Sequence, residues 1–240
     1  PEMLERLGAA FTVHRLSDAA DPVSWLAEHG AKIHYVATNG HDGVKPDYIK
    51  ALPNLKLISC YGVGYDAIDT NLARAGGIMV THTPNVLNAE VASTALMLML
   101  ACYRNLLADD AYVRSGDWET GGNAPLSRSA DNQVVGIVGL GRIGQAIADK
   151  LAPFNATILY HARSQKMVPY QYFESLLDMA RASDVLICIT PGGEATNKLI
   201  NAEVINALGP KGTLINVSRG SVVDETAMIA ALQEGRLGWA

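Results

Sequence analysis

The sequence of 240 residues has few cysteines and no long hydrophobic run. The three cysteines, Cys60, Cys102 and Cys188, are scattered, so they form no disulfide framework, and no pair has the spacing of metal ligands. We therefore predict no metal site and a reducing, cytoplasmic location. The longest apolar run, residues 95–103, is about half of a membrane span, and residues 1–6 lack the profile of a signal peptide. No membrane partner is expected.

Basic residues are also scarce, because 19 Lys and Arg stand against 24 Asp and Glu and leave a net charge of −5. This balance argues against a nucleic-acid partner. Apolar residues are abundant, at 49% of the chain, which is typical of a globular protein and excludes disorder. A chain of this length buries about 70–75% of its unfolded surface, so its core needs no disulfides.

Short apolar segments alternate with helix-like segments along the chain, a pattern typical of parallel sheets with helices on their faces. In the first part, the pattern predicts strands at residues 11–14, 33–38, 57–60 and 78–81, and helices at 22–28, 45–52 and 70–75. In the second part, it predicts strands at residues 134–138, 157–160, 185–190 and 213–217, and helices at 143–151, 172–182, 201–208 and 224–234.

One long helix is expected between the two parts, at residues 88–107. Because it is apolar nearly all round, it should be buried between elements or between subunits, and it points to a homodimer. Residues 115–133 are rich in turn formers and are predicted to be a loop. The sequence thus predicts an α/β protein with two doubly wound parallel-sheet domains, at residues 1–87 and 88–240.

The strongest local motif is the glycine loop, residues 139–144, which follows an apolar strand and opens a helix. That context is the one in which G-x-G-x-x-G indicates dinucleotide binding. Gly139 permits a tight turn, Gly141 lets the backbone approach a pyrophosphate, and Gly144 lets the helix pack on the strand. The alternative is a strand-to-helix turn without a ligand. The predicted cofactor-binding residues of the loop are Gly139, Leu140, Gly141, Arg142, Ile143 and Gly144.

The next strand ends without an acidic residue, at His161-Ala162-Arg163-Ser164. An Asp or Glu about twenty residues after the loop usually binds the free ribose 2′-hydroxyl of NAD. Arg163 stands 19 residues after Gly144, and a guanidinium beside the hydroxyl of Ser164 suits a 2′-phosphate. NADPH is therefore the preferred cofactor over NADH, and a solvated basic turn is the alternative.

Three further segments resemble one known family, the D-isomer-specific 2-hydroxyacid dehydrogenases. Residues 60–69 (CYGVGYDAID) resemble its substrate loop, residues 80–92 (VTHTPNVLNAEVA) its inter-domain crossing, and residues 215–225 (INVSRGSVVDE) its catalytic-arginine signature. The resemblance implies a flavodoxin-like substrate domain followed by a Rossmann nucleotide domain.

Two shorter segments, YHARS at residues 160–164 and TPGG at 190–193, are most similar to the glyoxylate/hydroxypyruvate reductase group of that family. The resemblance implies NADPH-dependent reduction of a small 2-oxoacid. It also implies substrate-binding roles for the backbone of Val63 and Gly64, and a catalytic and substrate-binding role for Arg219. The alternative for Val63 and Gly64 is a plain β-turn without a ligand, and the alternative for Arg219 is a surface salt bridge. Further cofactor-binding positions implied by the resemblance are Thr190, Pro191, Thr196, Val217 and Ser218.

Two residues near these motifs are given structural roles. Asp224 is interpreted as the N-cap of the following helix and not as a catalytic acid. Asn155 is expected to adopt the left-handed conformation in the turn after the helix predicted at residues 143–151.

A proton donor is missing from this pattern. The family uses a His paired with a Glu, both beyond the arginine signature, and none of the six histidines follows Arg219. Neither His82 nor His161 is a credible replacement. We therefore expect a chain truncated at both ends. The alternative is a non-catalytic, NAD(P)-sensing protein similar to the corepressor branch of the family.

Overall fold

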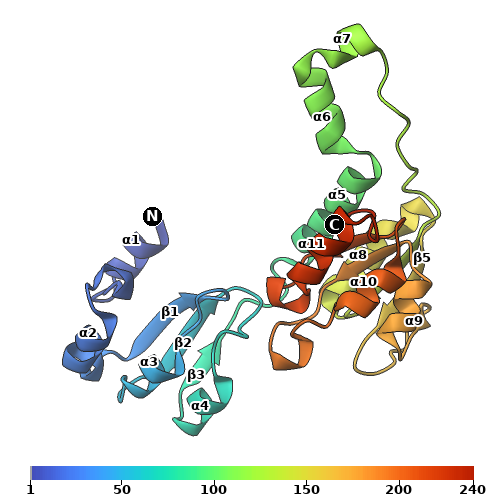
Figure 1. Cartoon of the computed structure of the whole chain (residues 1–240). Coiled ribbons are helices and arrows are strands. Elements are labelled where there is room, and N and C mark those ends of the chain that lie inside the picture. Colours follow the sequence, from blue (N-terminus) through green and yellow to red (C-terminus); the bar gives the residue numbers. More distant parts are fainter. Residues whose placement is uncertain (1) are drawn as a thin grey trace. The chain divides into compact units, whose positions relative to one another are not determined.

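The chain divides into two compact units, Pro1–Pro84 and Asn85–Ala240 (Figure 1). The structure is a computed structural model that describes residues 2–240. Pro1, the first residue of the predicted substrate domain, lies outside the described residues. Each unit contains its own parallel sheet and its own hydrophobic core.

The first unit has three parallel strands in the order β1-β2-β3. Its helices are Glu2–Gly8 (α1), Pro22–His29 (α2), Pro46–Lys50 (α3) and Thr70–Ala75 (α4), and its strands are Tyr35–Asn39 (β1), Leu57–Tyr61 (β2) and Met79–Thr81 (β3). Asp21 and Asp69 begin α2 and α4, because each carboxylate accepts hydrogen bonds from first-turn N–H groups. Ile58 and Cys60 are two residues apart on β2, so both point to the same face, into the core of this unit.

The second unit has five parallel strands in the order β6-β5-β4-β7-β8. Its strands are Val134–Val138 (β4), Thr157–His161 (β5), Gln171–Tyr172 (β6), Val185–Cys188 (β7) and Thr213–Asn216 (β8). Its helices are Asn88–Tyr103 (α5), Leu106–Ser115 (α6), Asp117–Gly121 (α7), Arg142–Leu151 (α8), Leu176–Arg181 (α9), Ala202–Leu208 (α10) and Glu225–Gln233 (α11). The direction of winding reverses between β4 and β7, and ligands of doubly wound sheets bind at such a switch point.

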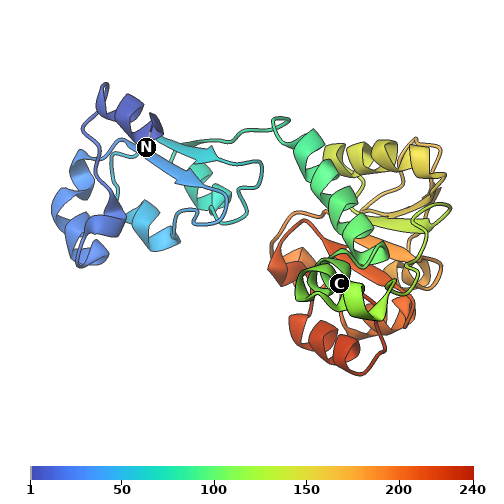
Figure 2. The same ribbon diagram turned by 90° about the horizontal axis from the view of Figure 1, so that it is seen from above.

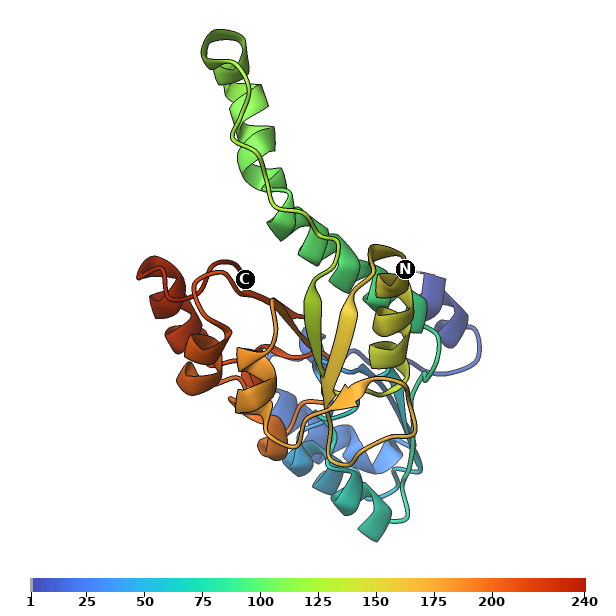
Figure 3. The ribbon, with the colours of Figure 1, turned by 90° about the vertical axis from the view of Figure 1, so that its right-hand side faces the viewer.

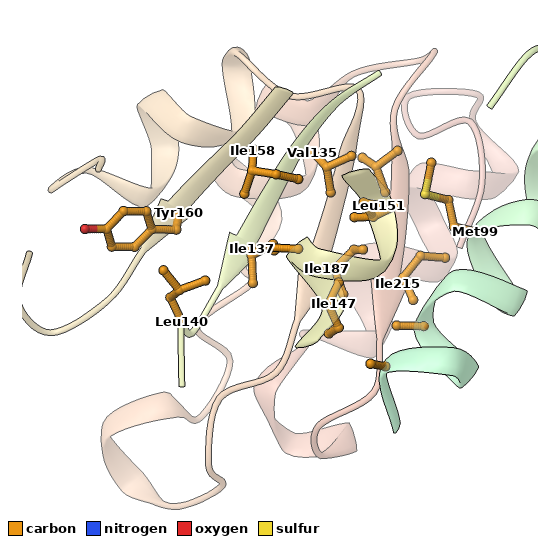
Figure 4. Packing of buried hydrophobic residues seen from close by; sticks show 14 of the residues in the cluster. Met99, Val135, Ile137, Leu140, Ile147, Leu151, Ile158, Tyr160, Ile187 and Ile215 are labelled. Atoms are coloured by element: carbon orange, nitrogen blue, oxygen red, sulfur yellow. The ribbon is translucent and has the colours of Figure 1, made fainter. Parts of the chain in front are cut away.

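Helices cover both faces of the second sheet. Along β7, Val185 and Ile187 point to the face covered by α5 and α8, while Leu186 and Cys188 point to the face covered by α9, α10 and α11. Figure 2 shows α5 beside α8. Figure 4 shows side chains of β4, β5, β7 and β8 packed with those of α5 and α8. These layers confirm the parallel α/β fold predicted from the sequence.

Three predicted elements differ at the edges of the units. The strand expected at residues 11–14 is absent within residues 2–240, because this segment finds no strand to pair with. The loop expected at residues 115–133 contains the short helix α7. The helix expected at residues 172–182 begins only at Leu176, where the hydroxyl of Ser175 accepts from the N–H of Asp178; residues 171–172 pair with β5 instead.

The single long helix expected at residues 88–107 is two helices. Asn105 adopts the left-handed conformation, with φ of 50°, and this ends the helix between α5 and α6. Ala92, Ala95, Met99 and Tyr103 of α5 are buried in the unit's own core, whereas α6 and α7 bury no residue. Figure 3 shows α6 and α7 extending away from the second sheet.

A helix that crosses a membrane must be both long and apolar. No single helix within residues 2–240 is long and apolar enough to cross a membrane. Helices α5 and α6 taken together are long and apolar enough by length and composition only, and the pair is bent by 58°.

The base of the α6–α7 excursion is held by Arg128. Its guanidinium carbon lies 4.0 Å from the ring centroid of Tyr103 and 3.4 Å from that of Trp239. It also donates to the carbonyl of Lys211 and to the hydroxyl of Thr213. Burial lowers the pKa of Arg128 from its usual value. Three other segments of the unit, at residues 103, 211–213 and 239, therefore meet at this one cation.

Candidate functional site

The glycine loop joins β4 to α8 at the switch point of the second sheet. Gly139 has φ of 102°, a conformation that favours glycine. A Cβ at Gly144 would overlap the carbonyl oxygen of Gly139, so glycine is needed for α8 to pack this close to the loop. A Cβ at Gly141, in contrast, would meet no atom within 4 Å. The space beside Gly141 is therefore open to a ligand.

The amino end of α8 offers donors to that space. Gly141 precedes the helix and supplies no side-chain cap. The N–H groups of Arg142 and Ile143 have no acceptor in the part of the chain that the structure describes. Unpaired N–H groups and the positive end of the helix dipole together make a site for a phosphate. The open space and these donors fit the pyrophosphate of a dinucleotide.

Two predicted loop residues direct their side chains elsewhere. Leu140 is buried in the core between β4 and α8. The guanidinium of Arg142 donates to the side-chain oxygen of Asn85, at 2.6 Å. Only the backbone of these residues is therefore placed to contact a ligand at the loop.

The carboxyl end of β5 lies beside the glycine loop. The carbonyl of His161 accepts from the N–H of Gly139 at 2.8 Å, which fixes the two segments together. The Nδ1 of His161 lies 3.0 Å from the carbonyl oxygen of Phe173, and because a carbonyl only accepts, Nδ1 carries the hydrogen. Arg163 and Ser164 follow on an exposed turn. The structure thus places an exposed guanidinium and a hydroxyl one strand away from the loop.

The carboxyl end of β7 carries a polar group without a partner. The hydroxyl of Thr190 is buried and has no hydrogen-bond partner among residues 2–240. An unsatisfied buried hydroxyl costs about 1–3 kcal/mol, so a ligand that bonds to it recovers this energy. Thr196 closes the adjoining turn by donating to the carbonyl of Pro191 at 2.7 Å. Thr190 and Pro191 are thus at the same edge of the sheet as the glycine loop.

Arg219 lies on the turn after β8, and Asn216 shapes this turn. The side-chain oxygen of Asn216 accepts from the N–H and the hydroxyl of Ser218, at 3.1 and 2.8 Å. Its amide donates to the carbonyl of Arg219 at 2.9 Å. Val217 extends the pairing of β8 with β7 through the carbonyl of Cys188, at 3.1 Å. Asn216 is not among the site residues predicted from the sequence, although an Asn at a strand end is a known turn signal.

Two titratable groups near this edge, Asp224 and Cys188, have pKa values shifted by their structural surroundings. Asp224 caps α11 by accepting from the N–H of Ala227, and this bond, with help from Lys198, lowers the pKa of its carboxyl. Burial raises the pKa of the Cys188 thiol to about 12. The N-cap role predicted for Asp224 is confirmed, as is the left-handed conformation of Asn155, with φ of 52°. Within residues 2–240, no three His, Cys, Asp or Glu side chains gather at a metal-like site.

In the first unit, Val63 and Gly64 lie in the loop after β2. Their N–H groups have no acceptor among the residues that the structure describes. The carbonyl of Gly62 accepts from the N–H of Thr83, and the carbonyl of Val63 from Nδ1 of His82, each at 2.9 Å. Two successive unpaired N–H groups in a fixed loop suit a carboxylate. The Nδ1 of His82 is committed to this backbone contact, in agreement with the prediction that His82 does not replace the proton donor.

Known proteins resemble the chain over most of its length. Residues 96–240 match the family model described as D-isomer specific 2-hydroxyacid dehydrogenase, NAD binding domain. Glyoxylate/hydroxypyruvate reductase A of Arabidopsis thaliana is 43% identical over 216 residues, which cover 90% of this chain and 69% of the relative. The 2-ketogluconate reductase of Gluconobacter oxydans is 39% identical over 243 aligned residues, which cover 100% of this chain and 76% of the relative.

A solved structure shares the fold. The NADPH-dependent glyoxylate/hydroxypyruvate reductase from Sinorhizobium meliloti, in complex with NADP and malonate, superimposes with a TM-score of 0.91 at 43% identity, covering 99% of this chain and 74% of that one. The resemblance inferred from the substrate loop and the arginine signature is therefore confirmed by sequence and structure. The chain belongs to the D-isomer-specific 2-hydroxyacid dehydrogenase family.

Proposed function

We propose that the protein is an oxidoreductase that uses NADPH to reduce small 2-oxoacids, glyoxylate and hydroxypyruvate, to 2-hydroxyacids. The observation that carries this function is Arg219, a half-buried cation at the edge of the sheet that also carries the glycine loop. Its main-chain carbonyl is held by Asn216. The relatives described above are reductases, which favours catalysis over the nucleotide-sensing alternative.

The chain binds a pyridine nucleotide. Its pyrophosphate would be held by the unpaired N–H groups at the start of α8, beside the open space at Gly141. Thr190 offers its unpartnered hydroxyl at the end of β7, and the other proposed contacts at this edge are Pro191, Thr196, Val217 and Ser218. When bound, the reduced nucleotide supplies the hydride for the carbonyl carbon of the substrate.

The substrate would be held through its two functional groups. The N–H groups of Val63 and Gly64 would donate to the carboxylate. The planar guanidinium of Arg219 can contact a carboxylate and a carbonyl oxygen at once, and it stabilises the negative charge that grows on that oxygen. This division of roles requires a 2-oxoacid, because a simple aldehyde lacks the carboxylate.

The test of this function is the oxidation of NADPH by the purified full-length protein with different carbonyl compounds. Glyoxylate and hydroxypyruvate should be reduced. Glycolaldehyde, which is hydroxypyruvate without the carboxylate, should be reduced far more slowly. A protein that binds NADPH but oxidises it with neither acid is a binding protein, and the proposal is then wrong.

Arg163 should set the preference for NADPH. Replacing it with alanine should weaken NADPH binding by about 1.5–3 kcal/mol, the size of a hydrogen bond to a charged group, while NADH binding barely changes. The exposed position of Arg163 means that the fold should be unaffected. Fluorescence titration of both nucleotides measures the effect, with Arg181→Ala, another exposed arginine of this unit, as the control. Equal losses for both nucleotides would contradict the assignment.

We also propose that the protein is a homodimer that associates through the excursion formed by α6, α7 and residues 122–127. Leu107 and Val113 of α6 are 83% and 61% exposed, and Leu126 is also fully accessible. Several strongly exposed apolar side chains on one excursion favour an interaction surface. Light scattering should give a mass twice that of one chain for the wild type. For Leu107→Asp, it should give the mass of a single chain. An unchanged mass in this variant would place the interface elsewhere.

A cytoplasmic location is proposed from the cysteines. Cys60, Cys102 and Cys188 all carry thiols and form no disulfide with one another. Persistent thiols are usual in a reducing compartment. Fractionation of the native host should therefore recover the protein with cytoplasmic marker enzymes.

A further inference from the structure

Three successive carbonyls of the substrate loop are each held by a hydrogen bond. The Gly62 carbonyl accepts from the N–H of Thr83 at 2.9 Å. The next, that of Val63, accepts from Nδ1 of His82 at 2.9 Å, and that of Gly64 from the thiol of Cys60 at 3.6 Å. The contact from His82 reaches 19 residues back along the chain. The loop is thus fixed from its carbonyl side.

The orientation of these carbonyls determines where the unpaired N–H groups point. In a trans peptide, the C=O and the N–H of the same unit point in opposite directions. The structure contains no cis peptide bond among its described residues. The bond from Thr83 therefore turns the N–H of Val63 away from the third strand. The bond from His82 does the same for the N–H of Gly64.

We propose that His82 is a positioning residue for carboxylate binding, because its Nδ1–H fixes the peptide unit that presents the N–H of Gly64. The inference rests on the proposed function, in which this N–H binds the substrate carboxylate. Since a carbonyl oxygen only accepts, Nδ1 must carry the hydrogen. The ring of Tyr65 lies edge-on to the imidazole, with 4.8 Å between centroids, and restricts its rotation. His82 itself does not touch the substrate.

Two amide substitutions separate this role from simple packing. In asparagine, the amide nitrogen lies as many bonds from Cα as Nδ1 does in histidine. In glutamine, it lies as far as Nε2. His82→Asn can therefore keep the hydrogen bond to Val63, whereas His82→Gln and His82→Leu place no donor there. His82→Gln serves as the polar control of similar size, and it decides the question if His82→Leu fails to fold.

The experiment compares the full-length wild type with these three variants. We expect His82→Leu and His82→Gln to raise the KM for glyoxylate about tenfold, the loss expected for one hydrogen bond, with little change in kcat. The dissociation constant of NADPH should stay constant, because the glycine loop belongs to the other unit. His82→Asn should return KM to within about threefold of the wild-type value.

A binding measurement makes the result independent of turnover. Oxamate is an unreactive 2-oxoacid analogue, and calorimetric titration onto the protein with NADP gives its affinity for each variant. Weakening by His82→Gln with recovery in His82→Asn supports the inference, even if no acid is reduced and the proposed function fails. Equal oxamate affinity in all four proteins would overturn the inference, as would an Asn variant as weak as the Gln variant or a wild type that binds no oxamate.

Discussion

Replacing Arg219 with alanine is expected to lower kcat for glyoxylate by about 10²–10³-fold. The guanidinium supplies positive charge where the carbonyl oxygen becomes an alkoxide, and losing one such group typically costs this factor. The turn should survive, because Asn216 holds the main-chain carbonyl of Arg219 and not its side chain. Steady-state kinetics and the thermal melting temperature measure the two effects separately.

Lysine should not restore the activity of the Arg219 variant. A point charge engages one oxygen at a time, whereas the planar fork of arginine can contact the carboxylate and the carbonyl oxygen together. Arg219→Lys should therefore remain at least about tenfold below the wild type, with the loss shared between kcat and KM. The exposed Arg181→Ala serves as the control for the loss of a cation. Full activity in Arg219→Lys would show that only charge is needed.

Replacing Gly144 with alanine is expected to destabilise the second unit by about 3 kcal/mol, the upper range for a side chain forced into a packed site. The new methyl group would overlap a backbone oxygen, that of Gly139, which cannot move without separating α8 from the loop. This loss is a large part of a typical stability of about 5–15 kcal/mol. Chemical denaturation measures it directly.

Gly141→Ala is the matched control, because it should leave stability unchanged and weaken NADPH binding. Its methyl group would enter open space, and φ of −91° at this position suits alanine, so stability should be unchanged. The same methyl group would stand where the pyrophosphate approaches the backbone, so NADPH affinity should fall at least about tenfold. If Gly141→Ala binds NADPH normally, the pyrophosphate does not lie beside this residue.

The parts of the site that the sequence predicted are those in which neighbouring residues act together. The spacing of Gly139, Gly141 and Gly144 reports a turn and a close approach within one strand–loop–helix unit, and the structure contains both. The cap at Asp224 and the turn at Asn155 are equally local. Such features follow from backbone preferences that hold wherever the segment lies.

The parts that the sequence did not predict depend on distant segments. His82 contacts a backbone carbonyl 19 residues away, and any residue type supplies that acceptor, so no pattern marks the pair. The expected strand at residues 11–14 failed for the same reason, because pairing needs a partner that periodicity does not supply. The helix break at Asn105 is only partly predictable, since asparagine tolerates the left-handed conformation but does not require it.

The contacts of Arg128 at the base of the α6–α7 excursion have a consequence for how this protein can change during evolution. The N–H of Arg128 donates to the carbonyl of Tyr103 at 3.0 Å, and Arg104 donates to the hydroxyl of Ser127, so the chain leaves and returns at one point. Residues 105–126 therefore form an insertion whose two ends already meet. Its length and sequence can drift, or be replaced by a short turn, without altering the register of the strands. Association between subunits can thus be gained or lost independently of the nucleotide-binding fold.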